Sequence, residues 1–313
     1  MIGKDLLSIT DVTREDILAL ISDAIEMKAR GWLSLLERKT LALVFEKPSL
    51  RTRVSFEVAM RQLGGAAIYL SPAEVGLGQR ESVPDVARVL GRYVDAIAAR
   101  TFSHQTLELL GTHAGIPVIN ALSDLEHPCQ ALGDLLTIHE KKGELNRLTL
   151  AFIGDGNNVA NSLLLAASLT GVNFRIASPP GYAIQERILR RAQERARASG
   201  SEILCTDEPR VAVSGADIVY TDVWTSMGQE TEAEERRRVF ARYQVNSDLV
   251  SLARKDAILM HPLPAHHGQE VAEGILDGPQ SVVFDQAENR MHIQKAVLAQ
   301  MLGGLEVPLA GYR

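Results

Sequence analysis

Hydroxyl and guanidinium groups gather at residues 49–53, between an apolar run and a helical pattern. Ser49 can cap the helix, which leaves N–H groups of its first turn available to an anion. Thr52 adds a second hydroxyl, and Arg51 adds a planar guanidinium suited to phosphate. The segment is not a GxxxxGK[ST] loop. In the structural alternative, Ser49 only caps the helix and Arg53 pairs with Glu57.

A histidine and a glutamine follow the apolar run at 117–121. His127 precedes Pro128 and lies three residues before Gln130. A histidine at a strand end could donate to a carbonyl oxygen as negative charge develops on it; an ordinary structural histidine is the alternative. Cys129 could be a nucleophile, but the sequence identifies no catalytic base for it.

The segment 154–159, Gly-Asp-Gly-Asn-Asn-Val, opens like a dinucleotide fingerprint and then departs from it. Val159 stands where the third glycine belongs, and the segment 175–181 has no acid for a ribose. A nicotinamide-dependent enzyme is therefore disfavoured. Asn158 could bind a ligand carboxylate or cap the helix that follows.

An aspartate, Asp222, follows the apolar run that begins at residue 216, where it could hold a cationic amine or cap a turn. The charged segment 230–238 after it is expected to be solvent-exposed. His266 and His267 are adjacent and lack a partner at ligand spacing, so no metal site is predicted. An anion pocket, a carbonyl-polarising histidine and an amine-holding carboxylate suggest acyl transfer from an acyl phosphate to an amine.

Apolar β-branched runs alternate with helical patterns, which indicates an α/β fold of parallel, doubly wound sheets. Strands are predicted at 41–46, 66–70, 95–100, 117–121, 148–154, 173–179, 216–223 and 257–263. Helices are predicted at 14–30, 55–65, 104–114, 129–143, 158–171, 184–199 and 291–304. Because the polar clusters follow strands, they are expected to line one active-site cleft between two sheets.

Length and composition set the broad class. A chain of 313 residues suggests about two domains, with a boundary near 143–148. Lys and Arg number 33 against 39 Asp and Glu, a net charge of −6, which disfavours a nucleic-acid partner. No apolar run reaches the roughly 18 residues of a membrane span, and the first residues lack the apolar core of a signal peptide. The expected location is the cytoplasm.

Five motifs, in order along nearly the whole chain, resemble the aspartate/ornithine carbamoyltransferase family. They are SLRTRVSFE (49–57), HPCQ (127–130), GDGNN (154–158), DVWTSMGQE (222–230) and FDQAENR (284–290). The last three are similar to the ornithine branch. The resemblance implies transfer of a carbamoyl group from carbamoyl phosphate to L-ornithine, without metal or cofactor. It also implies a carbamoyl-phosphate domain, 1–143, joined by a C-terminal helix at about 291–313, and an ornithine domain, 144–290.

The resemblance also implies residue roles. The implied catalytic residues are Arg51, Arg100, His127 and Asp222. The carbamoyl-phosphate set is Ser49, Leu50, Arg51, Thr52, Gln79, Arg100, His127, Pro128, Cys129, Gln130, Pro262, Leu263 and Arg290. The ornithine set is Asn158, Asp222, Ser226 and Met227. The family forms trimers in which a loop of one subunit reaches its neighbour's site.

Three positions depart from the ornithine branch. Leu50 replaces a frequent threonine, and Pro262 replaces the usual cysteine, which makes residues 261–264 resemble the aspartate branch. Gly76 stands where the neighbour-reaching loop usually has glutamine, with Gln79 as a candidate substitute. Because of Pro262, the acceptor could be aspartate, putrescine or an acylated ornithine, while Gly76 leaves the neighbour's contribution open. A non-catalytic carbamoyl-phosphate-binding homologue is a further alternative.

Overall fold

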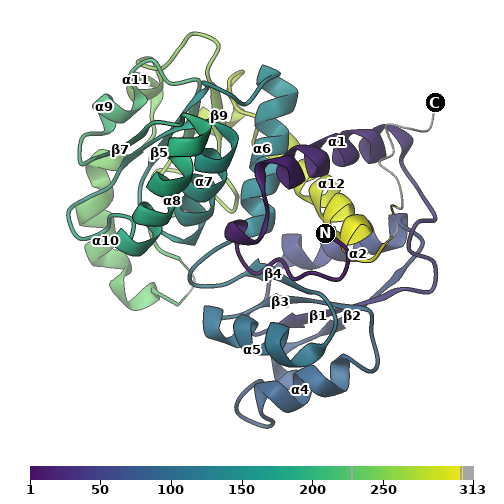
Figure 1. Ribbon diagram of the computed structural model, residues 1–313. Coiled ribbons are helices and arrows are strands. Elements are labelled where there is room, and N and C mark those ends of the chain that lie inside the picture. The colour runs from purple at the N-terminus through teal and green to yellow at the C-terminus, as the bar shows by residue number, and fades with distance from the viewer. Residues whose placement is uncertain (227, 304, 306–313) are drawn as a thin grey trace. The chain divides into compact units, whose positions relative to one another are not determined.

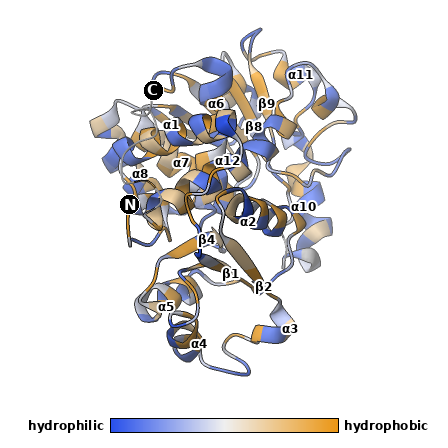
Figure 2. Ribbon diagram, turned by 90° about the vertical axis from the view of Figure 1, so that its right-hand side faces the viewer, coloured by the Kyte–Doolittle hydropathy of each residue, from blue (hydrophilic) through white to orange (hydrophobic). Residues whose placement is uncertain are grey.

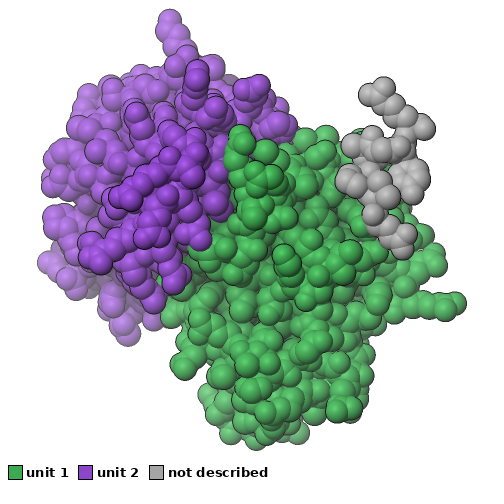
Figure 3. Space-filling model, in the orientation of Figure 1, with its two compact units in different colours: residues 1–136, 288–313 green, residues 137–287 purple. Residues whose placement is uncertain are grey.

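The computed structural model describes residues 1–226, 228–303 and 305 (Figure 1). The chain divides into two compact units, coloured separately in Figure 3. Unit 1 contains residues 1–136 and the described residues from 288 onward, and unit 2 contains residues 137–287. Each unit is built on its own parallel sheet, as the alternation of apolar runs and helical patterns predicted.

The sheet of unit 1 has the strand order β2-β1-β3-β4, and all of its pairings are parallel. Its strands are β1 (Thr40–Phe45), β2 (Ala66–Leu70), β3 (Ala96–Arg100) and β4 (Val118–Leu122). The helical elements are η1 (Ile9–Asp11), α1 (Arg14–Arg30), α2 (Leu50–Gln62), α3 (Pro72–Val75), α4 (Val83–Leu90) and α5 (His104–Ala114). Every residue of β3 is buried, as expected of a central strand in a covered parallel sheet.

The sheet of unit 2 has the order β7-β6-β5-β8-β9 and is also parallel throughout. Its strands are β5 (Thr149–Ile153), β6 (Asn173–Ala177), β7 (Ile203–Thr206), β8 (Ile218–Thr221) and β9 (Ile258–Met260). The helical elements are α7 (Asn158–Thr170), α8 (Glu186–Ser199), α9 (Pro209–Val213), η2 (Glu230–Glu232), α10 (Ala233–Phe240), η3 (Ala241–Tyr243), α11 (Ser247–Val250) and η4 (Ile275–Asp277). Strands β8 and β9 are hydrophobic in Figure 2, which matches their complete burial.

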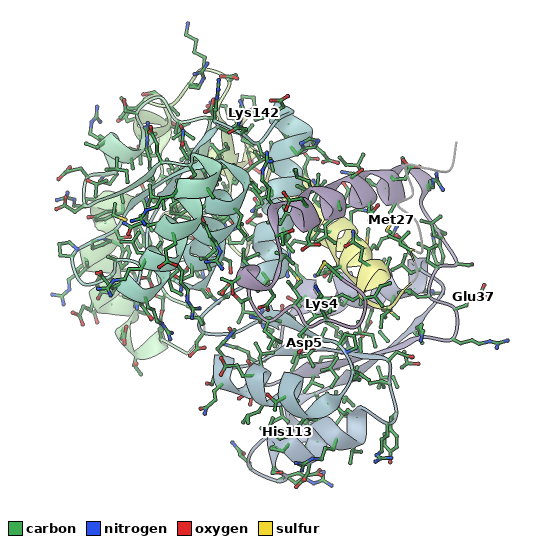
Figure 4. All side chains as sticks on the ribbon, in the orientation of Figure 1. Lys4, Asp5, Met27, Glu37, His113 and Lys142 are labelled. Atoms are coloured by element: carbon green, nitrogen blue, oxygen red, sulfur yellow. The ribbon has the colours of Figure 1, made fainter. Side chains whose placement is uncertain are left out.

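Two longer helices, α6 (Pro128–Lys142) and α12 (Val283–Met301), contain the positions where the chain passes between the units. From residue 288 on, α12 packs on unit 1, which confirms the expected return of the C-terminal helix. Lys295 Nζ donates to the carbonyl oxygens of Met27 (3.3 Å) and Gly31 (2.9 Å) at the C-terminal end of α1, near the labelled Met27 in Figure 4. The buried lysine thus adds a donor at the C-terminal end of α1, where Met27 O also accepts from Gly31 N at 3.0 Å.

Several predicted bounds were wrong. The first turn of α2 begins at Leu50 rather than near 55, because Ser49 caps it. The predicted strand 257–263 ends at Met260, since Pro262 has no N–H to donate to a ladder. The terminal helix begins at Val283 rather than 291. Its predicted end includes residues 304 and 306–313, which lie outside the described residues.

None of the described helices is both long enough and apolar enough to cross a membrane.

Candidate functional site

The anion-binding candidate of unit 1 lies at the first turn of α2. Ser49 caps this helix and donates its hydroxyl to Thr52 Oγ1 at 3.0 Å, while Arg290 Nη2 donates to the same oxygen at 3.0 Å. Arg53 pairs with Glu57 at 2.8 Å. Both the Ser49 cap and the Arg53–Glu57 pair of the structural alternative are therefore present. Neither involves Arg51, which is exposed.

Buried cations surround this turn. Arg100, the last residue of β3, is 7% exposed, and Arg290 on α12 is 5% exposed. Burial, together with the charges of Arg290 and Arg51, lowers the pKa of Arg100 to about 10. Arg290 reaches this place because α12 crosses α6 at Gly133, where an added Cβ would stand 3.3 Å from Arg290 Cα. The guanidinium of Arg100 is repelled by those of Arg290 and Arg51. A dianion bound among these three groups would be stabilised by their positive charge.

His127 is buried beside these cations, at the junction of β4 and α6. Burial and the charges of Arg290 and Arg100 hold its pKa well below the usual value, so the imidazole is neutral. Its backbone carbonyl accepts from Gln130 N at 3.1 Å. Gln130 Nε2 donates to Asp134 at 2.8 Å, and its buried Oε1 has no hydrogen-bond partner in the described part of the chain. That oxygen can accept from a ligand N–H.

The nucleophile alternative for Cys129 has no support in this environment. Burial raises the pKa of its thiol to about 12, and the reactive form of cysteine is the thiolate. The sulfur lies 3.8 Å from the backbone oxygen of Asn120. Pro128 is the first residue of α6, where a missing N–H costs nothing.

Gln79 belongs to an exposed turn of unit 1. It is exposed in a tight turn in which Gln79 N donates to Gly76 O at 3.0 Å and Gly78 N donates to Glu81 O at 2.9 Å. The turn belongs to the segment between α3 and α4.

The amine-binding candidate of unit 2 is Asp222, directly after β8. Its side chain accepts from Asn157 Nδ2 at 2.8 Å and from the N–H of Val223 at 2.8 Å. Asp222 is 8% exposed, and burial raises the pKa of its carboxyl, although nearby His261 and these donors act in the opposite direction. A buried carboxylate of this kind gains from a cationic or donating ligand.

The helix cap near Asp222 is one residue earlier than predicted. Asn157, not Asn158, caps α7, and its Oδ1 accepts from Val159 N (3.0 Å) and Ala160 N (3.1 Å). Asn158 is the first helical residue, so the capping alternative for it was wrong. Sequence reasoning missed Asn157 because two adjacent asparagines carry the same signal. Gly156 is explained by packing, since an added Cβ would stand 2.3 Å from Ile184 N.

A second turn of unit 2, residues 261–264, contains Pro262 and Leu263. His261 is completely buried; its Nδ1 accepts from Leu263 N at 2.9 Å, and its Nε2 lies 3.2 Å from Glu270 Oε1. Because Nδ1 accepts from Leu263 N, Nε2 is the ring nitrogen that can donate to Glu270. Pro262 and Leu263 therefore belong to unit 2, whereas the other predicted carbamoyl-phosphate residues belong to unit 1. Glu270 was not identified from the sequence.

The prediction that the charged segment 230–238 is solvent-exposed was wrong for part of it. Much of it forms α10, and Arg236 is only 5% exposed. Its Nη1 donates to Asp155 Oδ2 at 2.7 Å and to the carbonyl of Trp224 at 2.9 Å, and its Nε contacts Glu232 at 2.9 Å. The guanidinium thus ties the 222–230 loop to the 154–158 turn.

The remaining predicted ornithine residues lie in the 222–230 loop. Ser226 N donates to the side-chain oxygen of Gln229 at 3.0 Å, which closes a local turn. Met227 lies outside the described residues. Over the parts of the chain that the structure covers, no group of three or more His, Cys, Asp or Glu residues is placed to hold a metal ion.

Comparison with known proteins identifies the class to which this fold and these sites belong. Residues 4–140 match the carbamoyl-P binding domain of aspartate/ornithine carbamoyltransferase, and residues 146–301 match its Asp/Orn binding domain. The chain therefore belongs to the aspartate/ornithine carbamoyltransferase family.

Individual relatives agree with this assignment over almost the whole chain. An ornithine carbamoyltransferase of Anoxybacillus flavithermus is 52% identical over 304 residues, covering 96% of this chain and 97% of the relative. That of Bacillus subtilis is 53% identical over 300 residues, with coverages of 96% and 94%. The structure of ornithine carbamoyltransferase from Pyrococcus furiosus has a TM-score of 0.94 at 50% identity, covering 97% of this chain and 99% of that one.

Proposed function

We propose that the protein transfers the carbamoyl group of carbamoyl phosphate to the side-chain amine of L-ornithine, giving L-citrulline and phosphate in arginine metabolism. The observation that carries this proposal is the similarity, at about half of all positions and over nearly the full length, to relatives named ornithine carbamoyltransferase. The amine nitrogen attacks the carbonyl carbon of carbamoyl phosphate. The bond between that carbon and the bridging oxygen breaks, and phosphate leaves with the electron pair of this bond.

Unit 1 is the proposed carbamoyl-phosphate unit. The first turn of α2, with Ser49, Thr52 and the backbone N–H of Leu50, would bind the phosphate together with Arg51. Arg100 and Arg290 would bind it from the buried side, and its negative charge would offset the burial and the repulsion that lower the pKa of Arg100. Charge-assisted bonds from arginine to phosphate are among the strongest in proteins.

His127 would polarise the carbonyl oxygen. Because its imidazole is neutral, it carries one N–H, which can donate to the oxygen as negative charge develops there. Gln130 would hold the carbamoyl NH₂ through its buried, unsatisfied Oε1. Pro128 and Cys129 would contribute the backbone of this turn, and the thiol would take no part in bond formation.

Unit 2 is the proposed ornithine unit. Asp222 would bind the side-chain amine, with Asn158, Ser226 and Met227 binding the rest of the amino acid. An alkyl amine has a pKa near 10.4 and must lose a proton before it attacks. Pro262 offers neither a thiol nor an N–H, so the carbonyl of Leu263 would help Asp222 to orient the amine. The proton would pass to solvent or to the departing phosphate.

Charge favours ornithine over an aspartate acceptor. The Asp222 carboxylate repels an anionic side chain, and the nearby guanidinium of Arg236 is already paired with Asp155. The turn at residues 261–264, which resembles the aspartate branch, is the reason to test aspartate directly. The assembly proposed is a homotrimer in which Gln79 reaches a neighbour's site, and the proposed location is the cytoplasm.

The test is phosphate release from carbamoyl phosphate with ornithine, aspartate, putrescine or N-acetylornithine, with citrulline measured as product. Of the four acceptors, only ornithine is expected to give rapid phosphate release. The rate should rise with pH as the side-chain amine of ornithine deprotonates. A His127→Ala variant is the matched negative control for contaminating activity. Release with aspartate but not ornithine would overturn the choice of acceptor. Release with none of them, combined with tight carbamoyl-phosphate binding, would favour the non-catalytic alternative.

A further inference from the structure

The N-terminal segment, residues 4–12, lies along the edge of the unit 1 sheet. Leu6 N donates to Val118 O at 2.9 Å, and Asn120 N donates to Leu6 O at 2.8 Å, so Leu6 pairs in parallel with Ile119. Asp5, labelled in Figure 4, accepts from Val118 N at 2.8 Å. Strand β4 is the last strand of its sheet, and this segment occupies its otherwise open edge (Figure 1).

Beyond β4, the same segment contacts the loop that leads to His127. Asn120 Nδ2 donates to Leu7 O at 2.8 Å. The Ser8 hydroxyl donates to Glu126 Oε1, and Ile9 N donates to Glu126 Oε2 at 3.0 Å. Both carboxylate oxygens of Glu126 are therefore held by residues more than a hundred positions away in the chain.

Glu126 is buried together with the hydroxyl that holds it. It is 1% exposed and Ser8 is 8% exposed. Ile9 N belongs to the first residue of η1, so the carboxylate binds at the start of a helical turn that Ser8 caps. A buried carboxylate needs all of its donors, which makes the contact sensitive to small changes on either side.

The backbone on the other side of Glu126 is equally constrained. Ser123 N donates to Glu126 O at 2.9 Å, and Glu126 N donates to Ser123 Oγ at 3.2 Å. The next residue is His127, whose carbonyl begins the hydrogen bonding of α6. A displacement of Glu126 must therefore move the backbone that carries the imidazole.

We propose that Glu126, held by Ser8 and Ile9, is a positioning residue that sets the place of His127 during carbamoyl transfer. This inference rests on the proposed function of His127. Donors aimed at a reacting oxygen must be placed closely, and a misplacement of about 1 Å can cost roughly a hundredfold in rate. The N-terminal segment then supports the reaction without touching a substrate.

The test compares two perturbing variants with a matched control. Glu126→Gln replaces an accepting oxygen with an NH₂ group, and Ser8→Ala removes one donor. Asp5→Ala removes the acceptor of Val118 N, which disturbs the same segment at its contact with β4 and leaves the contacts of Glu126 untouched. We expect the first two variants to lower kcat by about tenfold to a hundredfold, with KM for both substrates within about threefold of wild type. Asp5→Ala should lower Tm but keep kcat, and Ser8→Thr, which retains the hydroxyl, should keep kcat as well.

A second readout does not depend on turnover. In protein labelled with ¹⁵N-histidine, the His127 signal, assigned through His127→Gln, should shift in Glu126→Gln and stay in place in Asp5→Ala. Losses of kcat that merely follow Tm across all variants, with His127 signals unchanged, would overturn the proposal. If the wild-type protein forms no citrulline, the proposed function fails, and the spectra still decide whether Glu126 positions His127.

Discussion

His127 and Cys129 lie two residues apart in the same buried turn, and burial has opposite consequences for their pKa values. It removes the positive charge from the imidazole and keeps the proton on the thiol. The neutral imidazole of His127 keeps one N–H that can donate, and the protonated thiol of Cys129 is a poor nucleophile.

From this contrast we expect His127→Ala to lower kcat by about a hundredfold to a thousandfold, which is typical for loss of one donor to a developing oxyanion. Carbamoyl-phosphate affinity, measured by calorimetry, should change far less. Cys129→Ser, in the same buried turn, is the matched control and should retain most of the turnover. A variant that binds carbamoyl phosphate poorly but keeps its kcat would make His127 a ground-state contact.

The ionised carboxylate of Asp222 is expected to lower the stability of the folded protein, because it is buried. Its pKa is 3.8 in an unfolded reference and higher in the folded protein, because burial penalises the charged carboxylate. The protonated form therefore favours folding at low pH, and this contribution is lost as pH rises through the raised pKa. Asparagine cannot ionise and avoids the loss.

Asp222→Asn should consequently gain Tm relative to wild type as pH is raised from about 4 to about 8. Over the same range it should lose most of its ornithine turnover, because the amine no longer meets a carboxylate. Thermal unfolding and citrulline formation, measured in matched buffers, test both parts. A Tm difference that stays constant with pH would show that the Asp222 carboxyl is not penalised by burial.

At the scale of elements, the arginine run 236–238 shows what a sequence pattern leaves undetermined. Three consecutive arginines on α10 have the same chemistry, but only Arg236 is buried, while Arg237 and Arg238 are exposed. The side chains of Arg236 and Asp155 are 6% and 11% exposed in their ion pair. Removal of one partner of such a buried pair costs about 3–5 kcal/mol, because the other charge stays buried and unpaired.

Arg236→Gln should therefore raise KM for ornithine by at least about tenfold and lower Tm. The affinity for carbamoyl phosphate should be unchanged, since both tied loops belong to unit 2. Arg237→Gln, one residue on, is expected to behave as wild type. The double variant Arg236→Gln/Asp155→Asn removes the stranded carboxylate and should recover part of the lost Tm. Equal effects of Arg236→Gln and Arg237→Gln on KM and Tm would exclude a specific role for Arg236.

Most of the strands and their alternation with helices could be predicted, because buried parallel strands are short apolar runs that a sequence displays directly. The edge strand β7 (Ile203–Thr206) was missed, because none of its residues is fully buried and it is not a purely apolar run. The motif-bearing loops could also be placed at strand ends. Which of Asn157 and Asn158 caps α7, and which arginine of α10 turns inward, depend on tertiary contacts that adjacent identical residues do not reveal. The same holds for Glu126, whose donors Ser8 and Ile9 come from a distant part of the chain.

At the scale of the whole molecule, Gln79 lies in a turn that is exposed in the single chain. In the proposed homotrimer, each site would combine Arg51 of one subunit with Gln79 of the next, through a head-to-tail interface. Arg51→Ala and Gln79→Ala trimers should then each lose most activity, because every site lacks one of the two groups.

Mixed trimers, made by unfolding and refolding the two variants together in equal amounts, test this arrangement. A site is intact only when its first subunit keeps Arg51 and its neighbour keeps Gln79, so random assembly should restore about one quarter of the wild-type activity. The same variants refolded separately and then combined are the control, and they should stay inactive while subunits do not exchange. No recovery in the mixture, with trimers verified by sedimentation, would mean that Gln79 serves its own chain or plays no part in the site.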